Sequence, residues 1–105
     1  MEFHHLGLEV NSLEESLEFY IHLCRFQLEE ELTLAGERII FLTKGELRLE
    51  LTENKETSSW HICFEVKEFP ALLPGAADYQ KYENGWESAF FHSQDGHLIE
   101  LLKRN

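Results

Sequence analysis

Residues 4–10 read HHLGLEV, and residues 61–66 read HICFEV. Both stretches are apolar, both have the pattern of a strand, and each opens with a histidine. An imidazole at the mouth of a core strand costs stability unless it finds a partner. The two stretches therefore raise the question of whether these histidines are incidental or are placed to meet.

Length and composition indicate one globular domain, residues 1–105. The hydrophobic content of 43% is enough for a core, and no apolar run approaches the ~20 residues that span a bilayer. The formal net charge is −11. Phosphate binding requires a basic surface, so this charge argues against nucleic acid and against anionic membranes as partners.

The N-terminus and the cysteines both favour a cytoplasmic protein. MEFHHLGLEV has neither the basic start nor the small-residue cleavage site of a signal peptide. Cys24 and Cys63 show no C-x-x-C spacing and no convincing disulfide framework. We expect two reduced thiols, each acting as a small buried apolar residue.

The first module, residues about 1–53, reads as strand, helix and three strands. Residues 3–10 form the first strand, and Ser12 with Glu15 forms a capping box at the start of a helix. Residues 26–34 are expected to form a half-exposed strand with its leucines on one face, and residues 38–43 and 47–53 two more strands. The helix has an apolar stripe of Leu13, Leu17, Tyr20, Ile21 and Cys24.

The second module, residues about 60–105, repeats this order after a polar linker at about 54–59. Residues 60–66 form its first strand, and Pro70 and Pro74 leave room for a brief helix only. A weak strand with a turn at 84–85 follows. Residues 87–93 and 97–103 form two further strands, joined by a turn at 94–96. The chain is therefore a duplicated β-α-β-β-β unit with a shortened second copy.

The duplication places a histidine and a glutamate at equivalent positions of both modules. His5 corresponds to His61, and Glu50 in L-E-L corresponds to Glu100 in I-E-L. An ionised carboxylate buried without a partner costs several kcal/mol. A divalent cation removes this cost, because two imidazoles and two carboxylates supply four ligand atoms and neutralise its charge. The alternative is that strand alternation turns each glutamate toward solvent.

Other polar residues have simpler expected roles. His4 should point away from the face of His5, as a surface or edge histidine, and we expect the same of His22, His92 and His97. Arg48 shares the face of Glu50, where it could hold a substrate anion or pair with an acid. Glu9 and Glu65 lie on the faces of the two histidines and could be outer groups of a metal site. The aromatic residues expected in the core, in an interface or as a wall of the site are Trp60, Trp86, Phe90 and Phe91.

The chain resembles the vicinal oxygen chelate superfamily over essentially its whole length. FHHLGLEVNSLEESLEFYIHL, residues 3–23, is similar to the opening strand and helix of that group. SQDGHLIELL, residues 93–102, is similar to its closing D-x-x-G-x-x-I-E-L motif. The group includes glyoxalase I, methylmalonyl-CoA epimerase, extradiol dioxygenases and fosfomycin-resistance enzymes. These motifs are specific for the superfamily and poorly specific for the reaction.

The resemblance implies an α+β fold, with two βαβββ modules forming an open cup-shaped mixed β-sheet around a metal. Its ligands by position are His5, Glu50, His61 and Glu100, a set similar to that of glyoxalase I. The ion would be Ni, Co, Zn, Mn or Fe(II). Two features depart from the family: Cys24-Arg25 replaces the usual Leu-Gly, and the short second module leaves little room for loops that hold glutathione.

Three functions follow from this resemblance. The first is a metal-dependent lyase or isomerase acting on a small substrate with vicinal oxygens through an enolate, with Glu100 or Glu50 as the base. The second is an Fe(II) ring-cleaving dioxygenase, which would need two histidines and one glutamate only. The third is a non-catalytic binding protein of the bleomycin-resistance type, a branch that usually lacks the ligands. An open sheet edge with apolar surface also predicts a homodimer.

Overall fold

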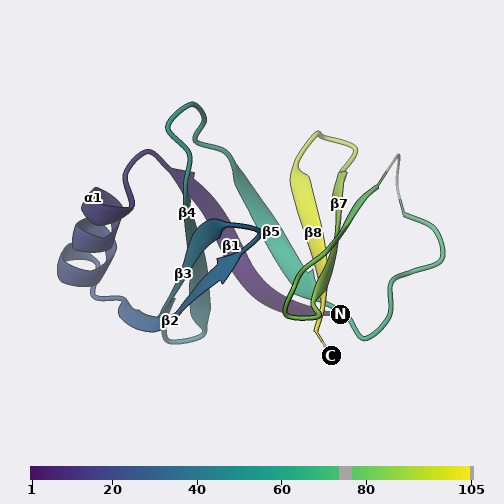
Figure 1. Cartoon of the computed structure of the whole chain (residues 1–105), viewed down its shortest axis with the longest axis horizontal. Coiled ribbons are helices and arrows are strands. Elements are labelled where there is room, and N and C mark those ends of the chain that lie inside the picture. The colour runs from purple at the N-terminus through teal and green to yellow at the C-terminus, as the bar shows by residue number, and fades with distance from the viewer. Residues whose placement is uncertain (74–76, 105) are drawn as a thin grey trace. The chain divides into compact units, whose positions relative to one another are not determined.

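The computed structural model describes residues 1–73 and 77–104 of the chain (Figure 1). Within these ranges the protein has eight strands and one helical segment, an α+β fold as expected. The chain divides into two compact units, which are described separately. The first unit is His5–Trp60, and the second is Met1–His4 together with His61–Asn105. The boundary between the units falls after Trp60, and the first four residues belong to the second unit. The expectation of a single domain stays a prediction.

The first unit contains a mixed sheet with strand order β2-β3-β4-β1. Strand β1 pairs in parallel with β4, and β3 pairs antiparallel with both β2 and β4. The parallel pair is possible because a helical crossover follows β1. The elements are β1 Glu2–Val10, α1 Leu13–Leu17, the π-helical turn η1 Glu18–Leu23, β2 Gln27–Leu34, β3 Glu37–Lys44 and β4 Leu47–Glu53.

The helical segment packs on one face of this sheet through the expected stripe. The Ser12 side-chain oxygen accepts a hydrogen bond from the Glu15 backbone N–H at 3.2 Å, so the predicted helix start is confirmed. Leu13 of the helix is 4% exposed, and burying a leucine side chain stabilises the fold by about 1.5–3 kcal/mol. The core cluster consists of Leu13, Phe26, Ile40, Leu42, Leu49 and Leu51, against which Leu17, Tyr20, Ile21 and Cys24 of the stripe also pack.

Strand β2 departs from the predicted alternation because it contains a β-bulge. Its pairing with β3 shifts register between Leu28 and Glu30. Leu28 pairs with Leu42 on the helix-covered face, whereas Leu32 pairs with Ile39 and so lies on the opposite face. The prediction that the leucines of this strand share one face is therefore wrong. An extra residue in one strand reverses the direction of every side chain beyond it.

The second unit repeats the strand arrangement of the first. Its strand order is β5-β8-β7-β6, with β5 parallel to β8 and the other two pairs antiparallel. The expected brief helix is not found: none of the residues between β5 and β6 that the structure describes, 66–73 and 77, is helical. Pro74, which was expected to limit that helix, lies outside the described residues. The strands are β5 Trp60–Glu65, β6 Asp78–Lys81, β7 Glu87–His92 and β8 Leu98–Lys103.

The predicted turns are present where glycine can adopt a positive φ. Gly45 joins β3 to β4 with a φ of 62°, and Gly85 joins β6 to β7 with a φ of 89°. The Gly85 backbone N–H donates to the Tyr82 carbonyl at 2.9 Å. These turns set the register of their hairpins. In the part of the chain that the structure describes, no helix is long and apolar enough to cross a membrane.

Candidate metal centre

The first unit brings His5 and Glu50 together. Gly7 of β1 is the register partner of Glu50 on β4, and His5 lies two residues before Gly7 on the same face. The His5 Nε2 atom is 3.5 Å from a carboxylate oxygen of Glu50. The His5 side chain is 1% exposed and that of Glu50 is 14% exposed. Phe41 on β3 pairs with Glu50, and its ring meets the His5 ring edge-on at 5.5 Å between centroids.

The second unit brings His61 and Glu100 together by the same register. Cys63 of β5 is the partner of Glu100 on β8, and His61 lies two residues before Cys63. The His61 Nε2 atom is 3.1 Å from Glu100 Oε1, and the Glu100 side chain is 7% exposed. Phe90 on β7 pairs with Glu100, and its ring meets the His61 ring edge-on at 6.0 Å.

Each unit therefore contains a His–Glu–Phe cluster with the same strand positions. The alternative that strand alternation turns Glu50 and Glu100 toward solvent is wrong, because both carboxylates are largely buried. Phe41 was missed by the sequence interpretation, although the turn at residues 45–46 places it opposite Glu50. Phe90, expected in the core or as a wall of the site, lies against His61.

Ser88 is a second residue that the sequence did not single out. Its hydroxyl donates to Glu100 Oε2 at 2.6 Å, and the residue is 0% exposed. Glu100 thus accepts from Ser88 at one oxygen and contacts His61 at the other. Ser88 precedes Phe90 by two residues, so the antiparallel register with β8 could have indicated that it shares the face of Glu100.

The charged residues near these clusters are engaged elsewhere. Arg48 binds Glu29 through two hydrogen bonds of 2.8 and 3.0 Å, so of its two expected roles the ion pair is the one observed. The Glu65 carboxylate binds Arg104 at 2.8 and 2.9 Å.

Glu9 binds the linker that follows β4. Its carboxylate accepts hydrogen bonds from the side chains of Ser59, of Thr57 at 2.8 Å and of Asn54 at 3.1 Å. The hydrogen bond from Ser59, followed by those from Thr57 and Asn54, holds the pKa of Glu9 below its usual value of 4.5. Glu9 is therefore an anchor for the linker.

The remaining histidines and the cysteines follow the expectations in part. His22, His92 and His97 are exposed as predicted. The prediction of a surface or edge position is wrong for His4, which is 5% exposed. Cys63 is buried as expected, and Cys24 is half-buried. The regular alternation assumed for the start of β1 does not decide burial, because both faces of a strand can be covered.

The donor chemistry of the two His–Glu pairs suits a divalent cation. Each pair offers an imidazole nitrogen and carboxylate oxygens in a water-poor setting, and this mixture is preferred by first-row metals. The buried carboxylates thus give a physical reason to expect a cation.

The family is shown by comparison with known proteins. The family model of the Glyoxalase/Bleomycin resistance protein/Dioxygenase superfamily matches residues 2–101. The chain therefore belongs to this superfamily, the vicinal oxygen chelate group that the sequence motifs resemble. Among curated proteins, none matches the sequence.

Solved structures show the same fold at low sequence identity. A hypothetical protein from Bacillus halodurans C-125 is 23% identical with a TM-score of 0.75, covering 99% of this chain and 94% of that one. Methylmalonyl-CoA epimerase from Mycobacterium tuberculosis is 16% identical with a TM-score of 0.71, covering 99% and 88%. A point variant of the Streptomyces coelicolor epimerase, in complex with 2-nitronate-propionyl-CoA, is 20% identical with a TM-score of 0.68, covering 98% and 96%.

Proposed function

We propose that this chain is a metal-dependent isomerase or lyase acting on a small substrate with vicinal oxygens. In this proposal His5, Glu50, His61 and Glu100 together bind one divalent cation: Ni, Co, Zn, Mn or Fe(II). The observation that carries the proposal is the recurrence of a buried His–Glu pair at equivalent strand positions of both units. A single buried pair has a purely structural explanation, whereas repetition of the pair at matching register favours a shared function.

When bound, the cation would act as a Lewis acid toward adjacent oxygens of the substrate. The chain's own contribution is a base that removes a proton next to a carbonyl, for which Glu100 and Glu50 are the candidates. We favour Glu100 because the Ser88 hydroxyl orients its carboxylate. A base held in position by a neighbouring donor loses less entropy when it accepts a proton.

The likeness to methylmalonyl-CoA epimerase guides the choice of reaction. That enzyme's name identifies it as an isomerase of a CoA ester, so an acyl-CoA with a second oxygen near the acidic carbon is the first substrate to test. The hemithioacetal of methylglyoxal and glutathione is the second, and a catechol with Fe(II) and oxygen is the third. Exchange of the acidic substrate hydrogen with deuterium from deuterated water measures proton removal by the base. This exchange requires no later step of the reaction.

Metal analysis of the purified protein, apo and after incubation with each ion, tests the proposal first. We expect about one ion per chain in the wild type, and loss of most of it in both His5→Ala and Glu100→Ala. His22→Ala is the matched control, because His22 is 67% exposed and its ion pair is with Glu18 of the same helical segment. Its metal content should equal that of the wild type.

The outcomes separate the competing functions. If each variant keeps half of the metal, the two pairs bind ions independently and the shared site is wrong. A wild-type protein that remains empty with every ion would favour the binding-protein alternative. Oxygen consumption with a catechol and Fe(II), unaffected by Glu50→Ala, would favour the dioxygenase, which needs one glutamate only.

We also propose that the protein acts in the cytoplasm as a homodimer. Strand β6 is exposed at every residue and has β7 as its partner in the second unit, so it presents a backbone edge. Multi-angle light scattering at several protein concentrations measures the mass, and a monomer throughout would contradict this part of the proposal.

A further inference from the structure

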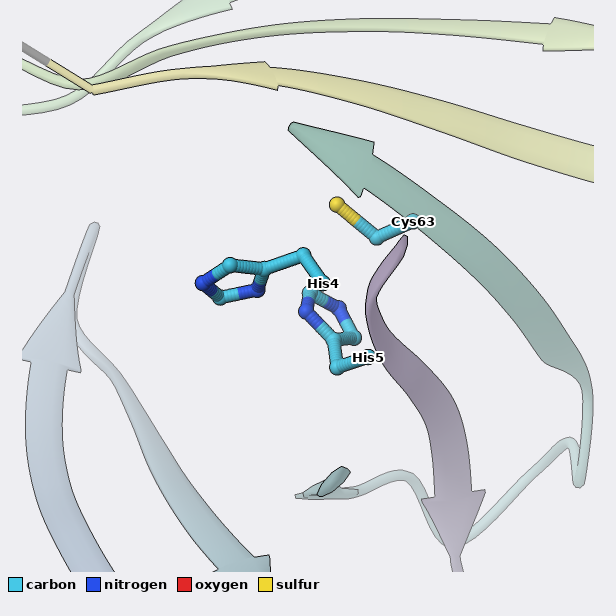
Figure 2. A group of neighbouring side chains, drawn as sticks. All are labelled: His4, His5 and Cys63. Atoms are coloured by element: carbon cyan, nitrogen blue, oxygen red, sulfur yellow. The ribbon is translucent and has the colours of Figure 1, made fainter. Parts of the chain in front are cut away.

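Outside the two His–Glu pairs, the second unit contains a buried imidazole and thiol in close proximity. His4, near the start of β1, is 5% exposed, and Cys63 on β5 is 0% exposed. A ring nitrogen of His4 and the Cys63 sulfur lie within 4.8 Å of each other. Figure 2 shows the His4 ring and the Cys63 sulfur extending into the same region from their two strands.

The burial of His4 is less common for its residue type than the burial of Cys63. Histidine is only intermediate in its tendency to be buried, and a buried cysteine is commonly inert filler. The Cys63 thiol has a weak contact to the Phe64 carbonyl, with 3.9 Å between the sulfur and the oxygen. Filler requires no ligand-forming neighbour, so the nearby His4 nitrogen distinguishes this cysteine from Cys24.

The two donors are close enough for one metal ion to contact both. Metal–sulfur and metal–nitrogen bonds of about 2.3 and 2.0 Å, as for zinc, add to about 4.3 Å when they lie end to end. The His4 nitrogen and the Cys63 sulfur lie within 4.8 Å of each other, which allows bonds of these lengths to one ion. Thiolate sulfur selects thiophilic ions, and Cu(I) is favoured over the hard divalent ions that carboxylates prefer.

We propose that His4 and Cys63 form a binding site for a soft monovalent cation, Cu(I). The juxtaposition of a buried imidazole nitrogen and a buried thiol carries this inference. Binding would replace the thiol proton by the metal, and the proton would leave to solvent. The two sites divide ligands by softness: nitrogen and sulfur in one, nitrogen and oxygen in the other.

Titration of the apo-protein with Cu(I), supplied anaerobically from a chromogenic chelator, tests the site. We expect the wild type to remove about one equivalent from the chelator and to gain a near-ultraviolet thiolate–copper absorption. Cys63→Ala and His4→Gln should each lower the Cu(I) affinity by more than about tenfold. Even the mutation of a residue that only hydrogen-bonds to a metal ligand lowers metal affinity by about 10- to 100-fold. Cys24→Ala is the matched control and should behave like the wild type.

The result that overturns the proposal is a Cys63→Ala protein with wild-type Cu(I) affinity and absorption. Equal losses in Cys24→Ala would also overturn it, since that thiol lies at the end of the helical segment. Circular dichroism on the same variants shows that each is folded. Mn²⁺ binding by the wild type tests the divalent site separately: a wild-type protein that binds Cu(I) but not Mn²⁺ would sink the divalent site and leave this one standing.

Discussion

The His–Glu–Phe clusters of the two units occupy matching strand positions but are held differently. His5 Nε2 is 3.5 Å from Glu50, whereas His61 Nε2 is 3.1 Å from Glu100. The Glu50 side chain is 14% exposed and that of Glu100 is 7% exposed. Duplicated register thus determines which residues meet, while the neighbouring side chains determine how closely they do.

A single neighbouring position accounts for part of this difference. Ser88 lies two residues before Phe90, and Ile39 lies at the equivalent position before Phe41. The Ser88 hydroxyl donates to Glu100 at 2.6 Å, which an isoleucine cannot do. A buried carboxylate with a hydrogen-bond donor is oriented before any ligand arrives. The Ser88 hydrogen bond thus orients the carboxylate of the second unit's pair, and the first unit has an isoleucine at the equivalent position.

The largest expected effect concerns the phenylalanines that pack on the histidines. Phe41 is 3% exposed, so Phe41→Ala should lower the free energy of unfolding by about 3–5 kcal/mol, the usual cost of such a cavity. Phe90 is half-buried, so Phe90→Ala should cost less. Urea unfolding followed by fluorescence measures both. Equal losses would show that the two clusters are packed alike and would remove the difference between the units.

Ser88→Ala tests whether the Ser88 hydroxyl makes the Glu100 carboxylate better oriented than that of Glu50. Loss of the hydroxyl leaves Glu100 Oε2 without this donor, and we expect metal affinity to fall by about 10- to 100-fold. Competition with a fluorescent chelator gives the affinity. Ser58→Ala is the control, because Ser58 is exposed in the linker. An unchanged affinity in Ser88→Ala would mean that Glu100 needs no support and that the two halves are equivalent.

The smallest effect concerns Glu9 and the linker of the first unit. Hydrogen bonds from Ser59, Thr57 and Asn54 lower the pKa of Glu9 in the folded protein below 4.5. Their contribution to stability is therefore complete above about pH 4.5 and is lost as the pH falls through the lowered pKa. Glu9→Gln should cost about 1 kcal/mol near pH 7, after allowance for solvent screening, and progressively less below pH 4.5.

Unfolding of the wild type and of Glu9→Gln across pH 2 to 7 provides the measurement. Glu46→Gln is a suitable control, because Glu46 is exposed in the turn between β3 and β4. A difference between wild type and Glu9→Gln that stays constant with pH would show that the carboxylate charge does not hold the linker.

Much of the strand order was predictable because its signals are local. The Ser12 cap and the glycine turns act over a few residues, and each appears where the sequence placed it. Recurrence of the same pattern in both modules singled out His5, Glu50, His61 and Glu100, and the structure shows that His5 lies beside Glu50 and His61 beside Glu100. The position of the turn at 45–46 also sets the register that places Phe41 opposite Glu50. The sequence interpretation missed this signal.

The errors lie where a local pattern meets a longer-range constraint. The bulge near Glu29 separates Leu28 from Leu32, and nothing in the alternation of that strand marks it in advance. His4 is buried although it is polar and lies near the start of its strand. The predicted second helix is not present among the described residues. Each outcome depends on what packs against the segment as well as on the segment itself.

The sequence by itself determined the family, the order of the strands along the chain and the residues that share a strand face with His5, His61 and Glu50. It could do so because side-chain direction alternates with a period of two along any strand. Only the tertiary structure decided that Glu50 and Glu100 are buried, that Ser88 binds one of them, and that His4 lies beside Cys63. Burial and hydrogen bonding across strands depend on neighbours that are distant in sequence, and no local pattern specifies which neighbours those are.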